Sequence, residues 1–230
     1  MLITPKIYND MPDIKFNEVS LEWVDSFKYV GLYIDKNLNF NYHIDILCNN
    51  LNKMKGVIYS VSTLVPQNVL IKLYQSLVYP VLINNVIIWG NSTQSNEKKI
   101  CVILNKILRI ILKVKYNENH VPLISTNYMY KQLNFMKFTD IYKYFLLKFA
   151  HYILYTNADL FNYCIKPHLS ENNYDTRHWI NLPYVRTDVE KRFAEFQMCK
   201  LLSDLPQYLI NDMTPYLLKR NFKSYVLNGH

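Results

Sequence analysis

Four basic side chains recur along one predicted helix at a spacing that suits recognition of phosphate groups. Lys99, Lys106, Arg109 and Lys113 follow one another at intervals of seven, three and four residues. At about 100° per residue they fall within an arc of about 80° on a helical surface. Cations in such a row can follow a phosphate backbone. The solvated face of an ordinary amphipathic helix carries the same residue types, so the sequence leaves both interpretations open.

Three helices are expected around this basic stripe. The stripe itself lies on a helix from Asn96 to Lys115, which we expect Ser95 to cap. A longer helix begins at Asn41, a candidate N-cap, and its apolar stripe continues to Val65. Pro66 ends that helix and can open the next, which Pro80 bends or ends. The short link between these two helices predicts that they pack antiparallel.

The residues before the helices predict strands. Residues 23–35 are rich in aromatic and β-branched side chains, which favours a single strand containing Gly31. Its expected partner is upstream, where residues 15–17 and 19–23 alternate apolar with polar side chains and Asn17-Glu18 is the predicted hairpin turn. A lone glycine in a strand marks a bulge or a close approach to the backbone.

The order of several short motifs resembles one known family. The matching segments are Ser26–Asp35 (SFKYVGLYID), Leu38–Phe40, His43-Ile44, Leu73–Pro80 (LYQSLVYP), Trp89-Gly90, Ile107–Ile111 around Arg109, Tyr174–Arg177 (YDTR), Leu182–Thr187 (LPYVRT) and Leu205-Pro206. This series is similar to the region that follows the catalytic motif in reverse transcriptases of non-LTR (LINE, jockey-like) retrotransposons. The resemblance covers nearly the whole chain.

The resemblance implies a role in holding nucleic acid. Phe27, Lys28, Tyr29 and Gly31 match the hairpin that grips the primer end in that family, and Lys99, Lys106, Arg109 and Lys113 would face phosphates. The implied partner is an RNA/DNA primer–template, with a palm-containing polymerase chain as a possible second partner. Two alternatives stay open: a helical protein-interaction module and a non-functional remnant of a mobile element.

The metal chemistry of the parent family has no counterpart here. Such polymerases hold Mg²⁺ on adjacent carboxylates, and this sequence has no Asp-Asp pair. The chain begins after the point where the family carries that pair, so we expect no catalytic residue and no cofactor of its own. Cys164 and His168, with His178 further on, lack the fourth ligand that a zinc site needs.

Composition narrows the class of protein further. Half of the 230 residues are apolar, which indicates a globular chain, and a net charge of +8 favours a polyanionic partner. Only four glycines occur, which argues against a glycine-rich phosphate loop. The four cysteines are widely spaced, as in a reduced protein of the cytoplasm or nucleus. The uncharged run from Leu73 to Asn96 is interrupted by polar residues and Pro80, so we expect no membrane span.

We therefore predict a mainly α-helical protein with an N-terminal β-hairpin unit, an α+β fold. Residues 1–40 would form the end of the palm and the grip hairpin, 41–120 a thumb-like helical domain, and 121–230 a helical extension. The connector is expected at residues 117–125. In the extension, Thr139 is predicted to cap a helix over residues 140–155, residues 163–185 to be irregular, and Thr214-Pro215 to open the last helix.

The missing carboxylates generate a first prediction. The purified chain should extend no primer on an RNA template in the presence of Mg²⁺, because no paired carboxylates are available to hold two metal ions. A primer-extension assay checks this, with an intact reverse transcriptase as positive control. Template-dependent synthesis by the pure chain would overturn it.

Overall fold

The computed structural model describes residues 13–115, 124–169, 180–211 and 214–228. It is mainly helical, with two small antiparallel hairpins at the N-terminal end, which confirms the predicted fold class. The predicted connector lies largely outside the described residues, as do the YDTR segment and His178. Among the described helices, none is both long enough and apolar enough to cross a membrane.

The upstream hairpin forms where the sequence predicted it, and a second hairpin replaces the single strand predicted for residues 23–35. Strands β1 (Lys15–Phe16) and β2 (Val19–Ser20) pair across Asn17-Glu18, and both turn residues have positive φ, so this predicted turn is confirmed. The expected strand of residues 23–35 is wrong. It folds back on itself as β3 (Ser26–Tyr29) and β4 (Leu32–Asp35), with Val30 and Gly31 as the turn. Gly31 therefore serves a tight turn at φ 82°, where a glycine is favoured.

One carboxylate joins the second hairpin to the first long helix, α1 (Asn41–Val61). Asp35 Oδ2 accepts a hydrogen bond from the Phe40 amide at 2.7 Å, and its Oδ1 accepts from the amides of Asn37 and Asn39 at 3.1 and 3.2 Å. Asn39 in turn accepts from the Asn41 amide at 2.9 Å. Asn41 is consequently the first helical residue and not the cap, because upstream side chains already satisfy these amides.

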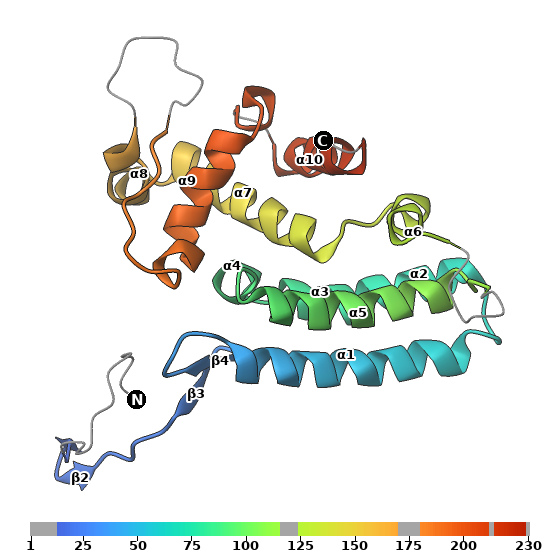
Figure 1. Cartoon of the computed structure of the whole chain (residues 1–230), viewed down its shortest axis with the longest axis horizontal. Coiled ribbons are helices and arrows are strands. Elements are labelled where there is room, and N and C mark those ends of the chain that lie inside the picture. Colours follow the sequence, from blue (N-terminus) through green and yellow to red (C-terminus); the bar gives the residue numbers. More distant parts are fainter. Residues whose placement is uncertain (1–12, 116–123, 170–179, 212–213, 229–230) are drawn as a thin grey trace.

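The chain then makes a return pass. α2 (Gln67–Leu73), a π-helical turn η1 (Tyr74–Val78) and α3 (Tyr79–Ile83) run back antiparallel to α1, as predicted (Figure 1). Pro80 lies inside this helical run and does not end it. Proline clashes with the carbonyl four residues earlier, and the wider π turn just before it accommodates the ring. The run breaks only at Asn84, and α4 (Val86–Trp89) follows.

The helix of the basic stripe, α5 (Gln94–Ile111), lies parallel to α1. Asn96 Nδ2 donates to Asn41 Oδ1 at 2.7 Å, and Lys99 pairs with Asp45 one turn further along both helices. The N-cap of α5 is Thr93 and not the predicted Ser95, because the Thr93 hydroxyl accepts a hydrogen bond from the Asn96 amide. The helix also ends earlier than the predicted Lys115.

The remaining helices cover the other side of α5 (Figure 1). α7 (Phe138–Thr156) packs against α3, α4 and α5, and against α9 (Ala194–Asp204) and α10 (Pro215–Asn228). Thr139 is inside α7 and not its cap, whereas the Thr214 hydroxyl accepts from the Leu217 amide at the start of α10, as predicted. The shorter elements are α6 (Thr126–Leu133), α8 (Ala158–Cys164), η2 (Lys166–His168), η3 (Glu190–Arg192) and η4 (Gln207–Leu209).

A single cluster of buried apolar side chains runs from Leu32 to Phe222. It crosses the position near residue 120 where the sequence suggested a domain boundary, and the division into domains remains a prediction. Trp89 is fully buried within this cluster, its ring stacks on Phe138 at 5.6 Å, and its Nε1 donates to the Asn84 carbonyl at 2.7 Å. The core therefore joins the first helices to α7.

The close approach of α4 to α7 generates a second prediction. At Gly90, an added Cβ would lie 2.6 Å from Cδ2 of Tyr142 and closer still to the Val86 carbonyl oxygen, neither of which can yield easily. We expect Gly90→Ala to lower the free energy of unfolding by about 2–3 kcal/mol, as overpacking does. Urea denaturation measures the change.

Gly56 offers the matched control. It lies inside α1, where an added Cβ would meet no described atom within 4 Å apart from its chain neighbours and the backbone of its own helix. Gly56→Ala should therefore raise the free energy of unfolding by about 0.5–1 kcal/mol through helix propensity. Equal effects of the two substitutions would show that the contact between α4 and α7 is loose.

Candidate nucleic-acid interface

A groove of about 740 Å³ lies between the second hairpin, α1 and the end of α3. Its polar lining comes from Lys28, Tyr33, His43 and Asn50, and from the Asn84-Asn85 pair. None of the described lining residues carries a carboxylate. The groove therefore presents a cation and several hydrogen-bonding groups, which suits an anionic ligand.

The tip of the second hairpin, Val30-Gly31, contacts the opposite wall of the groove at Asn84-Asn85. The Asn85 side-chain amide donates to the Val30 carbonyl at 3.1 Å, and Gly31 lies so close to Asn84 that an added Cβ would be 3.1 Å from its Nδ2. Val30 and Asn85 both have left-handed backbone, at φ 47° and 52°. A β-branched residue is rare in that region, so the turn holds Val30 in a strained conformation.

Lys28 is fixed above an aromatic ring on the groove side of the hairpin. Its Nζ lies 5.3 Å from the centre of the Tyr33 ring, in cation–π geometry. Tyr33 in turn packs edge-on against Tyr42 at 5.2 Å. This support from the helix start holds a positive charge beside the groove, and within the described ranges no carboxylate forms an ion pair with it.

His43 connects the groove to the core. Its ring lies 5.4 Å from that of Trp89, and its Nδ1 accepts a long hydrogen bond, 3.5 Å, from the Tyr33 amide. That assignment requires an unprotonated Nδ1. Burial lowers the pKa of His43 below its ordinary value of 6.5, in agreement with a neutral ring. From the sequence, a packing or hydrogen-bonding role at the helix start was the favoured interpretation of His43.

The predicted hairpin residues divide between the two faces of the hairpin. Lys28 pairs with Tyr33 and lines the groove with Gly31, whereas Phe27 and Tyr29 pair with Ile34 and Leu32 on the opposite face. Phe27 and Tyr29 remain 56% and 63% exposed. Two of the four predicted residues thus reach the groove, and the other two face solvent elsewhere.

The predicted basic stripe is not part of the groove. No α5 residue is among the described lining residues. Asp45, the partner of Lys99, lies about 140° around α1 from Asn50. The groove therefore follows one flank of α1, and the stripe follows the seam of α1 with α5 on another flank.

The four cations of the stripe differ in their surroundings. Lys99 Nζ is 2.7 Å from Asp45 Oδ1, and this hydrogen bond raises the pKa of Lys99. Lys106 is exposed, and Arg109 is half-buried with its Nε unpaired among the described residues. Lys113 lies beyond the helix at φ 49°, where its amide and that of Val114 close a Schellman-type end. Lys106 and Lys113 are therefore the freest charges of the four.

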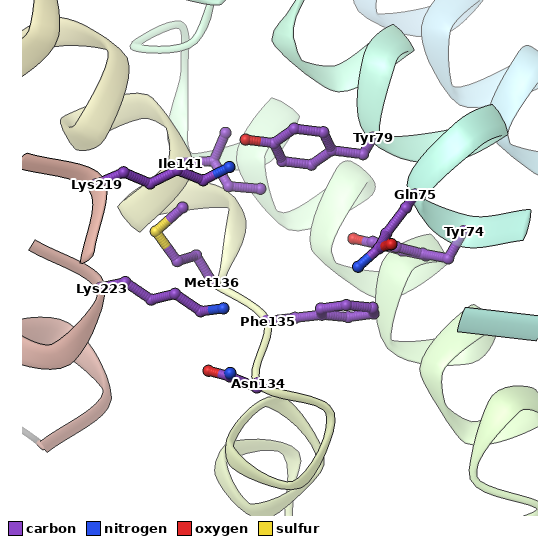
Figure 2. Close-up of a pocket in the computed structure, with 9 residues that line it drawn as sticks. All are labelled: Tyr74, Gln75, Tyr79, Asn134, Phe135, Met136, Ile141, Lys219 and Lys223. Carbon is purple, nitrogen blue, oxygen red and sulfur yellow. The ribbon is translucent and has the colours of Figure 1, made fainter. Parts of the chain in front are cut away.

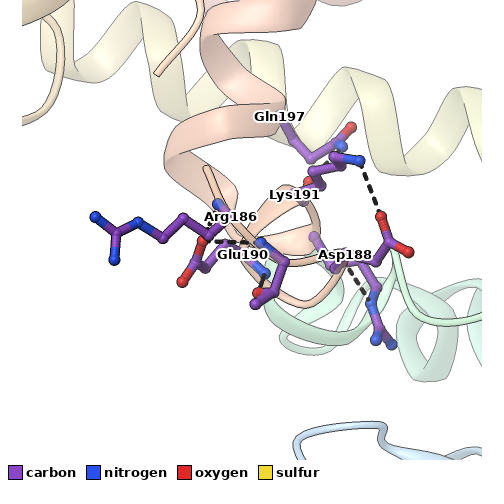
Figure 3. A network of polar contacts seen from close by, with 7 residues as sticks. Arg186, Asp188, Glu190, Lys191 and Gln197 are labelled. Atoms are coloured by element: carbon purple, nitrogen blue, oxygen red, sulfur yellow. Dashed lines mark hydrogen bonds and ion pairs between the residues drawn. The ribbon is translucent and has the colours of Figure 1, made fainter. Parts of the chain in front are cut away.

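A second polar cluster lies at the start of α9 (Figure 3). Glu190 accepts from the amides of Arg186 and Thr187, and the Thr187 hydroxyl accepts from the Glu190 amide at 3.2 Å. This reciprocal pair is a capping box. The Arg186 guanidinium extends away from the network, whose hydrogen bonds hold the helical turn before α9.

Metal chemistry finds no support in the described parts of the chain. They contain no group of three or more His, Cys, Asp or Glu side chains arranged to hold a metal ion. All four cysteines are free thiols, and Cys48 and Cys199 are buried.

Comparisons with protein families, curated proteins and solved structures gave no match for this chain.

The buried His43 generates a third prediction, on pH dependence. Because its pKa is lowered by folding, the folded state binds fewer protons than the unfolded state at pH values below about 6.5. The contribution of His43 to the free energy of unfolding should therefore be present in full above pH 6.5 and decrease as the pH falls below that value. Urea denaturation at pH 7.5, 6.5 and 5.5 measures this slope.

The substitution His43→Gln should flatten that slope, because it removes the titrating ring. An unchanged slope in His43→Gln would assign the pH dependence to other groups.

Proposed function

We propose that this chain binds a primer–template duplex as the grip, thumb and post-thumb part of a non-LTR retrotransposon reverse transcriptase. In this proposal it acts inside the cell and contributes binding, while the Mg²⁺-dependent chemistry of RNA-directed DNA synthesis belongs to catalytic carboxylates outside this chain. The observation that carries the proposal is the groove, which combines Lys28 and the Gly31 turn without any carboxylate in its described lining.

The hairpin supports a role in positioning a nucleic-acid end. Gly31 has no side chain of its own, so phosphate or sugar groups can approach its backbone closely on the side away from Asn84. Lys28 supplies a positive charge beside it. The Asn85 bond to the tip holds the turn in place, so a ligand in the groove would meet a preformed surface.

The basic stripe supports a second, weaker contact. Lys106 and Lys113 are exposed and can each neutralise one phosphate. Lys99 is already paired with Asp45, so it should contribute less than its position in the sequence suggested. Because stripe and groove lie on different flanks of α1, the proposal assigns them separate segments of a nucleic acid.

Exposed apolar side chains on the N-terminal hairpins support a protein partner. Phe16, Val19, Leu21, Phe27 and Tyr29 are each more than half exposed. Surfaces of this kind in a globular chain mark protein contacts. The proposal assigns them to a palm-containing polymerase chain, and the same residues favour the alternative of a protein-interaction module that binds no nucleic acid.

Salt-dependent binding provides the fourth prediction. A fluorescently labelled RNA/DNA hybrid should bind the chain with an affinity that falls steeply between 50 and 200 mM salt, because each phosphate contact releases counterions. Fluorescence anisotropy measures the slope of log K against log salt concentration. Lys28→Gln should weaken binding and reduce the magnitude of that slope by about 0.9, the contribution of one phosphate contact.

Two controls separate the groove from general charge. Lys191→Gln makes the same change in net charge, at a lysine paired with Asp188 far along the chain, and should leave binding nearly unchanged. Lys106→Gln should reduce the slope by no more than Lys28→Gln does, because it too removes at most one phosphate contact. Absence of binding in a chain that unfolds cooperatively would favour the interaction module, and absence of cooperative unfolding would favour a non-functional remnant.

A further inference from the structure

A second cavity lies on the other side of the molecule, between η1, the α6–α7 connection and α10. It has a volume of about 320 Å³, within the range of small-molecule sites. Figure 2 shows the residues that line it. Tyr74 and Tyr79 lie on one side, Lys219 and Lys223 lie on the other, and Phe135 and Met136 come from the segment just before α7. These residues are outside the groove proposed for nucleic acid.

The π-helical turn places both tyrosines on one wall. The Tyr79 amide donates to the Tyr74 carbonyl, five residues earlier. In an α-helix, residues five apart diverge by about 140°, whereas a turn that closes at the fifth residue brings them nearly into line. Single π turns occur frequently at functional sites. Here the irregular turn has a definite result, because both phenol rings face the same cavity.

Tyr74 brings an unsatisfied polar atom to this cavity. Only 2% of the residue is exposed, and its hydroxyl is buried with no hydrogen-bond partner among the residues that the structure describes. Its ring stacks on Phe135 at 4.6 Å, which fixes the direction of the hydroxyl. Figure 2 shows the hydroxyl pointing toward the space between the lysines and Tyr79. A buried donor is normally paired, so a ligand acceptor here would satisfy it.

The opposite wall concentrates positive charge. Lys219 and Lys223 are four residues apart on α10, and both extend into the cavity (Figure 2). Burial and the neighbouring Lys219 lower the pKa of Lys223. No carboxylate is present among the described lining residues. A bound anion would relieve the repulsion between the two ammonium groups.

We propose that this cavity binds a small organic anion that carries a planar ring. The phosphate or carboxylate would lie between Lys219 and Lys223 and accept from the Tyr74 hydroxyl, and the ring would pack against Met136 and the Tyr79 ring. The cavity volume admits one such molecule and excludes a polynucleotide. The proposal is independent of the function assigned to the groove.

Ligand-observed NMR with the whole chain tests this proposal. The probes are adenosine 5′-monophosphate and benzoate. The ring-alone and anion-alone counterparts are adenosine and inorganic phosphate for the nucleotide, and benzyl alcohol and acetate for benzoate. At least one of the first two should bind, and at least tenfold more tightly than its uncharged or ringless counterpart. Preference for the nucleotide identifies a phosphate site and preference for benzoate a carboxylate site. Failure of both probes overturns the proposal, as does equally tight binding of adenosine.

Substitutions locate the binding. The double variant Lys219→Gln/Lys223→Gln should weaken binding of the preferred probe at least tenfold, whereas Lys148→Gln, at an exposed lysine of α7, should not change it. Tyr74→Phe should also weaken binding while leaving the melting temperature equal or higher, because it removes the unsatisfied hydroxyl. Unchanged affinity in the double variant or in Tyr74→Phe contradicts the assigned site.

Discussion

The packing of the Trp89 indole is the contact on which the other elements depend. The ring is stacked on Phe138 of α7, lies beside His43 of α1, and uses its only donor on the Asn84 carbonyl at the break after α3. One side chain thus joins α4 to α1 and α7 and holds the bend between α3 and α4. Gly90, the next residue, allows α4 to approach Tyr142 closely. The return pass, which this contact holds in place, lines both the candidate groove and the cavity beside Tyr74 and Tyr79.

Apolar periodicity predicted the long helices well, and helix ends poorly. The stripes of α1, α5 and α7 were clear because each repeats over several turns. Their ends depend on side chains whose partners are distant: Asn41 bonds to Asn96 and leaves the capping to Asp35 and Asn39. α6 and α9 escaped prediction because short helices give little periodic signal. The turn at Val30 was missed because valine rarely adopts positive φ.

The candidate groove was only half visible in the sequence. Lys28 and Gly31 could be singled out, but strand alternation within the second hairpin sends Phe27 and Tyr29 to the other face, and the single-strand interpretation concealed this. The opposite wall, Asn84-Asn85, is more than fifty residues away along the chain. Its only local signal is an amide pair inside an apolar run. The separation of the basic stripe from the groove follows from how α1 packs, which no local pattern encodes.

The parallel alignment of α1 and α5 has a consequence for how the protein folds. Contacts such as Asn41 with Asn96 and Asp45 with Lys99 join residues 55 and 54 positions apart, because the whole return pass lies between them. Helical bundles with short antiparallel links fold quickly because their contact order is low. To form the α1–α5 interface, by contrast, the chain must first lose the entropy of closing a large loop. We therefore expect the α1–α5 interface to form late, after the return pass has organised, and to limit the folding rate of the N-terminal half.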